Sequence, residues 1–97
     1  MSYIRYKNNN LFVEGVSVRK LASKLSTPFY LYSEGSIIEN FKSFSNNFKT
    51  SKPLICFSVK ANSNIQILKV LKKMGSGADV VSGGELLKAL KSGIKPK

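Results

Sequence analysis

The sequence has no histidine and a single cysteine, Cys56. One cysteine cannot form a disulfide within the chain, and a zinc site built from cysteine and histidine is excluded. We therefore expect no metal site. Long hydrophobic runs are also missing, since no apolar stretch approaches the ~20 residues that cross a bilayer. The polar N-terminus has no signal-peptide core, so we expect a cytoplasmic protein with no membrane partner.

Acidic residues are scarce, with 5 Asp and Glu against 16 Lys and Arg, which gives a net charge of +11. Such a charge suggests nucleic acid. However, only Arg5 and Arg19 are arginines, the residue that makes most bidentate contacts to bases and phosphates. The lysines are also scattered along the chain. We therefore expect a solvated, lysine-rich surface and no nucleic-acid partner, with a small polyanion-binding module as the less favoured alternative.

The first part of the chain alternates between extended and helical patterns. Residues 11–13 predict a short strand, Glu14 and Gly15 a turn, and Ser17 the N-cap of a short helix. Pro28 ends that helix, and the aromatic run 29–32 predicts another strand.

The second part reads as a helix followed by a repeated strand–helix unit. Apolar residues at helical spacing predict a helix over 34–48. Strands are then expected at 54–59 and 78–82, the first followed by a helix that Asn64 caps and that 75–77 end. A tight turn at Gly83–Gly84 leads into a last helix over 85–91. The strand spacing implies parallel neighbours joined by a crossover helix. Because two parallel strands cannot form a buried sheet, we expect an N-terminal portion of a longer α/β protein.

Lys60 stands where the strand 54–59 gives way to polar residues. Alternation along this strand places Cys56, Ser58 and Lys60 on one face, and Ile55, Phe57 and Val59 on the other. The apolar face suits helices, and the smaller face suits the inside of a barrel, where Lys60 would lie at the end that carries chemistry. From position alone an ordinary surface lysine remains open. The functional interpretation is an amine sheltered from water that condenses with an aldehyde such as pyridoxal phosphate.

Two segments carry a family resemblance. Residues 57–64, FSVKANSN, resemble the Y/F-x-V-K-A-N motif of the fold-type III pyridoxal-phosphate decarboxylases. Residues 75–86, GSGADVVSGGEL, resemble the G-x-G-x-D-V-x-S-x-G-E-L segment of the same enzymes, at the matching distance. The chain is most similar to the diaminopimelate decarboxylase family, also in 11–16 and 27–32. Ala61 stands where ornithine decarboxylases usually have cysteine.

The resemblance implies an α/β fold, the N-terminal portion of a (β/α)8 barrel of the alanine racemase type. Residues 1–26 would be a lead-in associated with a β-domain, and 27–97 the first βα units of the pyridoxal-phosphate-binding barrel. Lys60 would form the Schiff base with the cofactor, and the implied reaction converts meso-2,6-diaminopimelate to L-lysine and CO2 in lysine biosynthesis. The complete enzyme is expected to be a homodimer acting on an amino-acid substrate, and 97 residues alone are expected to be inactive.

Further roles follow from the same resemblance. Asp79 is expected near the cofactor, with a loop-bracing role as the alternative. From its place in the first turn of a helix, Glu85 is expected to stabilise the helix start, with a catalytic role as the alternative. Ser82–Gly83–Gly84 is expected to form a turn, and Cys56 to fill space below the cofactor, with a nucleophile as the alternative. Another fold-type III decarboxylase, of the ornithine or arginine type, and a non-catalytic pyridoxal-phosphate-binding protein are the alternative functions.

Overall fold

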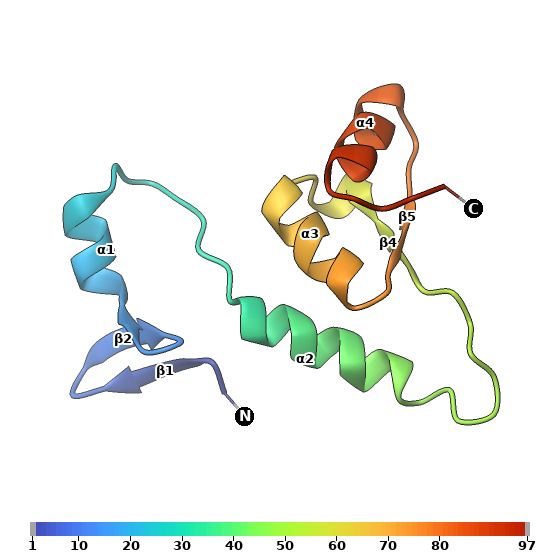
Figure 1. Cartoon of the computed structure of the whole chain (residues 1–97). Coiled ribbons are helices and arrows are strands. Elements are labelled where there is room, and N and C mark those ends of the chain that lie inside the picture. Colours follow the sequence, from blue (N-terminus) through green and yellow to red (C-terminus); the bar gives the residue numbers. More distant parts are fainter. Residues whose placement is uncertain (1, 97) are drawn as a thin grey trace. The chain divides into compact units, whose positions relative to one another are not determined.

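A computed structural model describes residues 2–96 of the chain (Figure 1). These residues form two compact units, which divide between Ser36 and Ile37. No helix in this part of the chain is both long and apolar enough to cross a membrane.

The first unit begins with a small antiparallel sheet in the order β1 (Ile4–Lys7), β2 (Asn10–Val13) and β3 (Val16–Ser17). Residues with positive φ connect the strands: Asn8 and Asn9 (51° and 61°), then Glu14 and Gly15 (50° and 80°). Two consecutive positive φ angles are typical of the tight hairpin turns that match strand twist. The predicted strand at 11–13 and the turn at Glu14 and Gly15 are therefore confirmed.

The predicted cap at Ser17 is also confirmed. Helix α1 (Val18–Lys24) follows it, and the Ser17 Oγ accepts a hydrogen bond from the Lys20 amide at 3.3 Å. The helix ends at Leu25, whose extended backbone precedes Pro28. The strand predicted at 29–32 is wrong, because these residues pair with no strand within 2–96. A strand needs a hydrogen-bonded neighbour, and the Tyr30 side chain is 87% exposed.

Helix α2 (Glu34–Ser45) starts at a cluster of polar contacts in the first unit. The Glu14 Oε2 accepts hydrogen bonds from the buried Ser33 hydroxyl at 3.0 Å and from the Gly35 amide at 3.4 Å. The Ser33 Oγ in turn accepts from the Ser36 amide at 3.0 Å. The helix ends before the predicted limit at 48, because Asn46 and Asn47 favour turns over helix.

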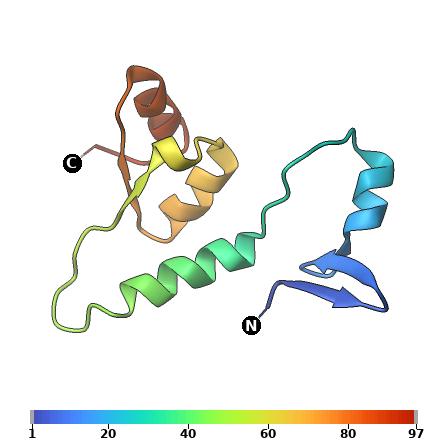
Figure 2. The same cartoon turned by 180° about the vertical axis from the view of Figure 1, so that it is seen from behind.

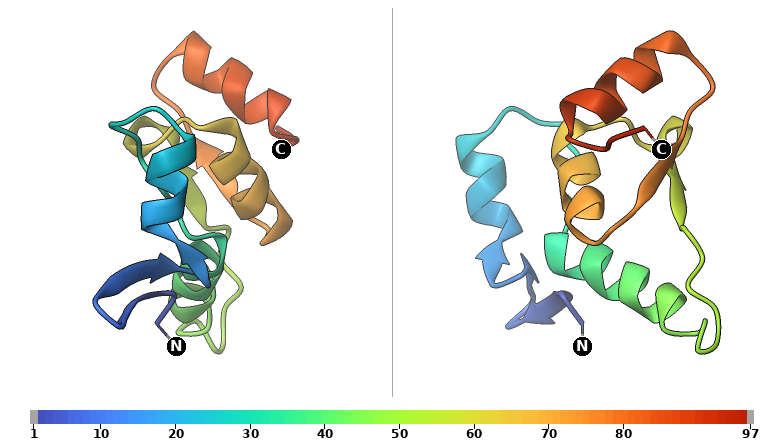
Figure 3. Two further views of the ribbon diagram at one scale, coloured as in Figure 1. Left: turned by 90° about the vertical axis from the view of Figure 1, so that its left-hand side faces the viewer. Right: turned by 45° about the vertical axis from the view of Figure 1, so that its right-hand side comes forward.

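The second unit contains a parallel pair of short strands, β4 (Cys56–Ser58) and β5 (Gly77–Asp79). Helix α3 (Ile65–Lys73) crosses between them, and α4 (Gly83–Lys91) follows β5, as Figures 2 and 3 show. The predicted parallel pairing and crossover helix are confirmed. Both strands are shorter than predicted, because only the residues that face each other across the pair form a ladder.

Helix caps account for the boundaries within this unit. The Asn64 Oδ1 accepts from the Gln66 amide, and α3 ends with the C-cap Met74, which Gly75 follows with a φ of +92°. The Ser76 amide then donates to the Leu71 carbonyl, which completes a Schellman motif. Ser82 caps α4, so Gly83 and Gly84 form its first turn. The turn predicted at Gly83–Gly84 is therefore wrong, because the serine cap starts the helix before it.

The core of the second unit lies between α3, α4 and the segment after β4. Leu68 and Val59 are fully buried at 0% exposure, and Ala89 of α4 is 2% exposed. Ile67 and Leu71 complete the buried face of α3, whereas Lys69, Lys72 and Lys73 are exposed as predicted. This core holds the ends of the two strands in place.

Candidate functional site

Lys60 lies just beyond the carboxyl end of β4, in a single 3-10 turn (η1, Val59–Ala61). The sequence predicted a strand over 54–59 whose side-chain alternation continues to Lys60, but the strand ends at Ser58 and Val59 already belongs to the turn. The Asn62 amide donates to the Val59 carbonyl at 3.1 Å and closes the turn. The strand ends early because its partner β5 ends at Asp79, the residue paired with Ser58. The lysine nevertheless stands at the carboxyl edge of the parallel pair.

Burial alternates along the chain that leads to Lys60. Cys56 and Ser58 are exposed, whereas Phe57 is half-buried and Val59 is fully buried. This confirms the two faces that the sequence predicted for the strand. The Lys60 side chain is exposed. Residues 2–96 therefore do not provide the shelter from water that the sequence analysis expected for its amine.

Asp79 is the last residue of β5 and lies at the same edge as Lys60. It faces Ser58 across the parallel pair, and its side chain is exposed. A carboxylate and an amine therefore follow the ends of two neighbouring strands. Because functional side chains in parallel α/β folds gather at the carboxyl ends of strands, this edge is the candidate site.

Glu85 has the structural role that the sequence predicted. Its amide donates to the Ser82 Oγ at 3.1 Å, and its own Oε1 accepts from the Val81 amide at 3.2 Å. These reciprocal bonds resemble a capping box and satisfy amides at the start of α4. Ser82 is therefore occupied by helix capping.

Ser63 and Lys88 form a contact that the sequence analysis missed. The Lys88 Nζ in α4 donates to the Ser63 Oγ at 3.1 Å, across 25 positions of sequence. Ser63 follows Lys60 by three residues, and α4 packs against the 3-10 turn. Lysine on the outer face of a helix gives no sequence signal for such a bond, because the partner is defined only by the fold.

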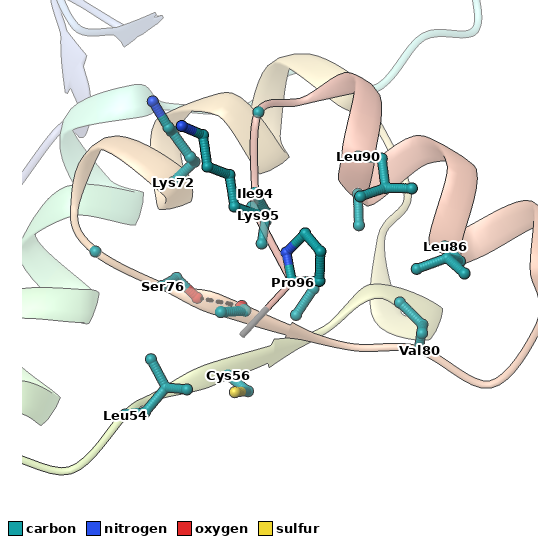
Figure 4. Close-up of a pocket in the computed structure, with 15 residues that line it drawn as sticks. Leu54, Cys56, Lys72, Ser76, Val80, Leu86, Leu90, Ile94, Lys95 and Pro96 are labelled. Carbon is teal, nitrogen blue, oxygen red and sulfur yellow. Dashed lines mark hydrogen bonds between the residues drawn. The ribbon is translucent and has the colours of Figure 1, made fainter.

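A groove of about 580 Å³ opens in the second unit between the strands, α4 and the segment that follows it (Figure 4). Its wall is mostly apolar, with Leu54, Cys56, Val80, Leu86 and Leu90 among the lining residues. Neither Lys60 nor Asp79 lines it. The groove is therefore separate from the candidate site, and Cys56 borders the groove from an exposed position.

The carboxyl edge of this parallel βα unit thus carries an exposed amine, a group that can condense with a carbonyl compound, in a chain of α/β fold. Residues 34–97 match the family described as pyridoxal-dependent decarboxylase, pyridoxal binding domain. This match covers most of the chain, and the chain therefore belongs to that family. The cofactor of the family is pyridoxal phosphate.

Among the proteins with sequences similar to this chain are diaminopimelate decarboxylases. The enzyme of Aquifex aeolicus is 46% identical over 95 residues, which cover 98% of this chain and 22% of the relative. The enzyme of Helicobacter pylori strain J99 is 51% identical over 77 residues, covering 79% of this chain and 19% of the relative. The chain thus spans about a fifth of the length of these relatives.

Solved structures of related proteins contain a segment with a similar backbone. A crystal structure of an Aquifex aeolicus protein has a TM-score of 0.90 and 47% identity, covering 97% of this chain and 23% of that protein. A diaminopimelate decarboxylase from M. jannaschii, solved with L-lysine, has a TM-score of 0.89 and 35% identity over 96% of this chain. The α/β fold described above is thus the N-terminal portion of the barrel of these decarboxylases, as the sequence analysis predicted.

Proposed function

We propose that this chain supplies the first βα units of a diaminopimelate decarboxylase, a carboxy-lyase that converts meso-2,6-diaminopimelate to L-lysine and CO2. The similarity to diaminopimelate decarboxylases over nearly the whole chain supports this reaction. The observation that carries the proposal is the position of Lys60. Its amine stands at the carboxyl edge of β4, within the segment that resembles the family's lysine motif.

The described residues fit pyridoxal phosphate by their chemistry. Lys60 offers an exposed primary amine that can hold the cofactor through its aldehyde carbon, and Asp79 offers a carboxylate at the same edge. When bound, the cofactor supplies an electron sink for the carbanion that forms as CO2 leaves. The amine of Lys60 is also suited to proton transfer at the reacting carbon.

Each residue has a defined part in this proposal. Lys60 holds the cofactor and handles a proton. Asp79 would place its carboxylate at the cofactor's edge of the strand pair, where a negative charge stabilises a nearby positive charge. Glu85 acts through the start of α4 and does not take part in the chemistry.

The organisation of the complete enzyme is part of the proposal. Residues 1–26 form the lead-in associated with a β-domain, and 27–97 begin the cofactor-binding barrel. The enzyme works as a homodimer in the cytoplasm, on a free amino acid, without a nucleic-acid partner. The family resemblance supports this organisation, and the chain matches about a fifth of the length of the relatives.

The test is CO2 release by the full protein that carries this chain, supplied with pyridoxal phosphate. We expect release from meso-2,6-diaminopimelate and little from ornithine or arginine. Lys60→Ala should lower the rate by at least about 100-fold, because it removes both the cofactor attachment and the proton-transfer group. Lys69→Ala, which removes an exposed lysine of α3, is the matched control and should keep full activity. Equal rates for the Lys60→Ala and Lys69→Ala proteins would refute the assignment.

A further inference from the structure

The segment from Lys60 to Asn64 follows a fully buried residue and lies beside α4, which has a buried residue of its own. Val59, next to Lys60, is fully buried, and Ala89, next to Lys88 in α4, is 2% exposed. These two residues anchor the backbone at η1 and at α4, and the two elements pack against each other. The side chains of Lys60 and Lys88 are both exposed next to these anchors. The edge that carries Lys60 therefore has a fixed base and movable side chains.

Within this segment, local hydrogen bonds tie the residues that surround Ser63. The Asn62 Oδ1 accepts from the Asn64 amide at 3.0 Å, and the Asn64 Oδ1 accepts from the Gln66 amide at 2.9 Å. Both bonds lie inside the loop and the start of α3. They shape the loop but do not connect it to α4.

The bond from Lys88 to Ser63 makes that connection. It joins an ammonium group to a hydroxyl at 3.1 Å, and hydrogen bonds with a charged donor are stronger than neutral ones. Ser63 itself is half-buried. A lysine side chain that keeps one bond to this loop restricts the conformations open to the residues just before it, including Lys60.

We propose that Lys88 is a positioning residue, which holds the Lys60–Asn64 loop through Ser63 and so orients the amine of Lys60. This inference rests on the proposed function, because it assigns Lys88 a part in presenting that amine to an aldehyde. Lys88 does not touch the reacting atoms in this proposal. It acts through Ser63 alone.

The test measures the rate at which Lys60 forms a Schiff base with pyridoxal phosphate in the full protein that carries this chain. The amine replaces the aldehyde oxygen, which leaves as water, and borohydride then delivers hydride to the carbon and leaves a stable secondary amine. Peptide mapping at timed intervals gives the rate at Lys60. We expect Lys88→Met to slow labelling about two- to tenfold, the range expected for the net loss of one hydrogen bond. Lys88→Arg retains a donor and should restore most of the rate.

Three further variants separate positioning from other effects. Lys91→Met removes the same charge from the same helix and should label at the original rate. Ser63→Ala should slow labelling as Lys88→Met does, and the double variant should be no slower than either single one. A purely structural role would lower the melting temperature of Lys88→Met without changing its labelling rate at temperatures where it is folded.

The outcomes distinguish this inference from the function on which it rests. If Lys60 is labelled at the same rate in the unchanged protein and in every variant, the role of Lys88 is overturned and the proposed function is left intact. Additive effects of Lys88→Met and Ser63→Ala would also overturn it. Absence of label at Lys60 in the unchanged chain would overturn both. If Lys88→Met does not fold, Ser63→Ala alone decides, because the proposal requires it to slow labelling.

Discussion

Lys60 shows how one buried residue can place its exposed neighbour. Val59 is fully buried and Lys60 is exposed, although the two are adjacent in a single turn. Burying Val59 contributes on the order of 1.5–3 kcal/mol, which fixes the backbone from which the lysine projects. The lysine side chain itself is exposed, and the bond from Lys88 to Ser63 lies three residues further along the same loop.

Gly77 is a second residue at which the fold leaves little room for a side chain. A Cβ at this position would lie 2.8 Å from the Cys56 Sγ, in the strand that pairs with it. We expect Gly77→Ala to lower the free energy of unfolding by about 1–3 kcal/mol, the usual cost of overpacking. The measurement is urea denaturation followed by circular dichroism.

Two variants control this prediction. Cys56→Ala removes the sulfur, so adding it to Gly77→Ala should recover most of the lost stability. Gly83→Ala adds a Cβ that meets no heavy atom within 4 Å and should cause no loss. If Gly77→Ala and Gly83→Ala have the same free energy of unfolding, the close approach to the Cys56 Sγ does not affect stability.

At the scale of elements, the starts of α1 and α3 were predictable from the sequence, whereas the start of α4 and the lengths of the strands were not. Ser17 and Asn64 cap the helices predicted from them, because a cap is made within three residues of its helix. The strand expected at 54–59 is shorter than predicted, and the strand expected at 29–32 is absent from the described residues. A strand extends only as far as the partner to which it is hydrogen-bonded. That partner lies elsewhere in the chain and leaves no local signal.

The candidate site likewise has features that could be predicted from the sequence and features that could not. The sequence predicted Lys60 at the end of one strand and Asp79 within the neighbouring strand at 78–82, and the structure instead ends that strand at Asp79, in register with Ser58. The 3-10 turn around Lys60 and the bond from Lys88 to Ser63 were not predictable. Both depend on how α4 packs, which involves residues some 25 positions away.

The cap of α4 gives a prediction at this scale. Ser82→Ala removes the acceptor for the Glu85 amide and should destabilise the second unit by about 1 kcal/mol. Hydrogen exchange at the Glu85 amide should become faster at the same time. Ser82→Asp keeps an acceptor and should behave like the original protein. Unchanged exchange in Ser82→Ala would show that the cap does not hold this end of the helix.

For the whole molecule, the described residues provide a reactive group and only part of its surroundings. The amine of Lys60 is exposed within residues 2–96, and the chain spans about a fifth of the length of the decarboxylases it resembles. An apolar groove beside β5 and α4 is separate from this edge. In the proposed function, this chain attaches the cofactor through Lys60, and the rest of the complete protein closes the pocket around it.

The most direct measurement of that assignment is the site of covalent attachment. The full protein that carries this chain is mixed with pyridoxal phosphate, reduced with borohydride and digested, and the labelled peptides are identified by mass spectrometry. The account predicts that the modified peptide carries its label on Lys60, and that Lys60→Arg loses this label while the exposed lysines of α3 gain none. A label spread evenly over the surface lysines, or concentrated on any lysine other than Lys60, would contradict the central claim.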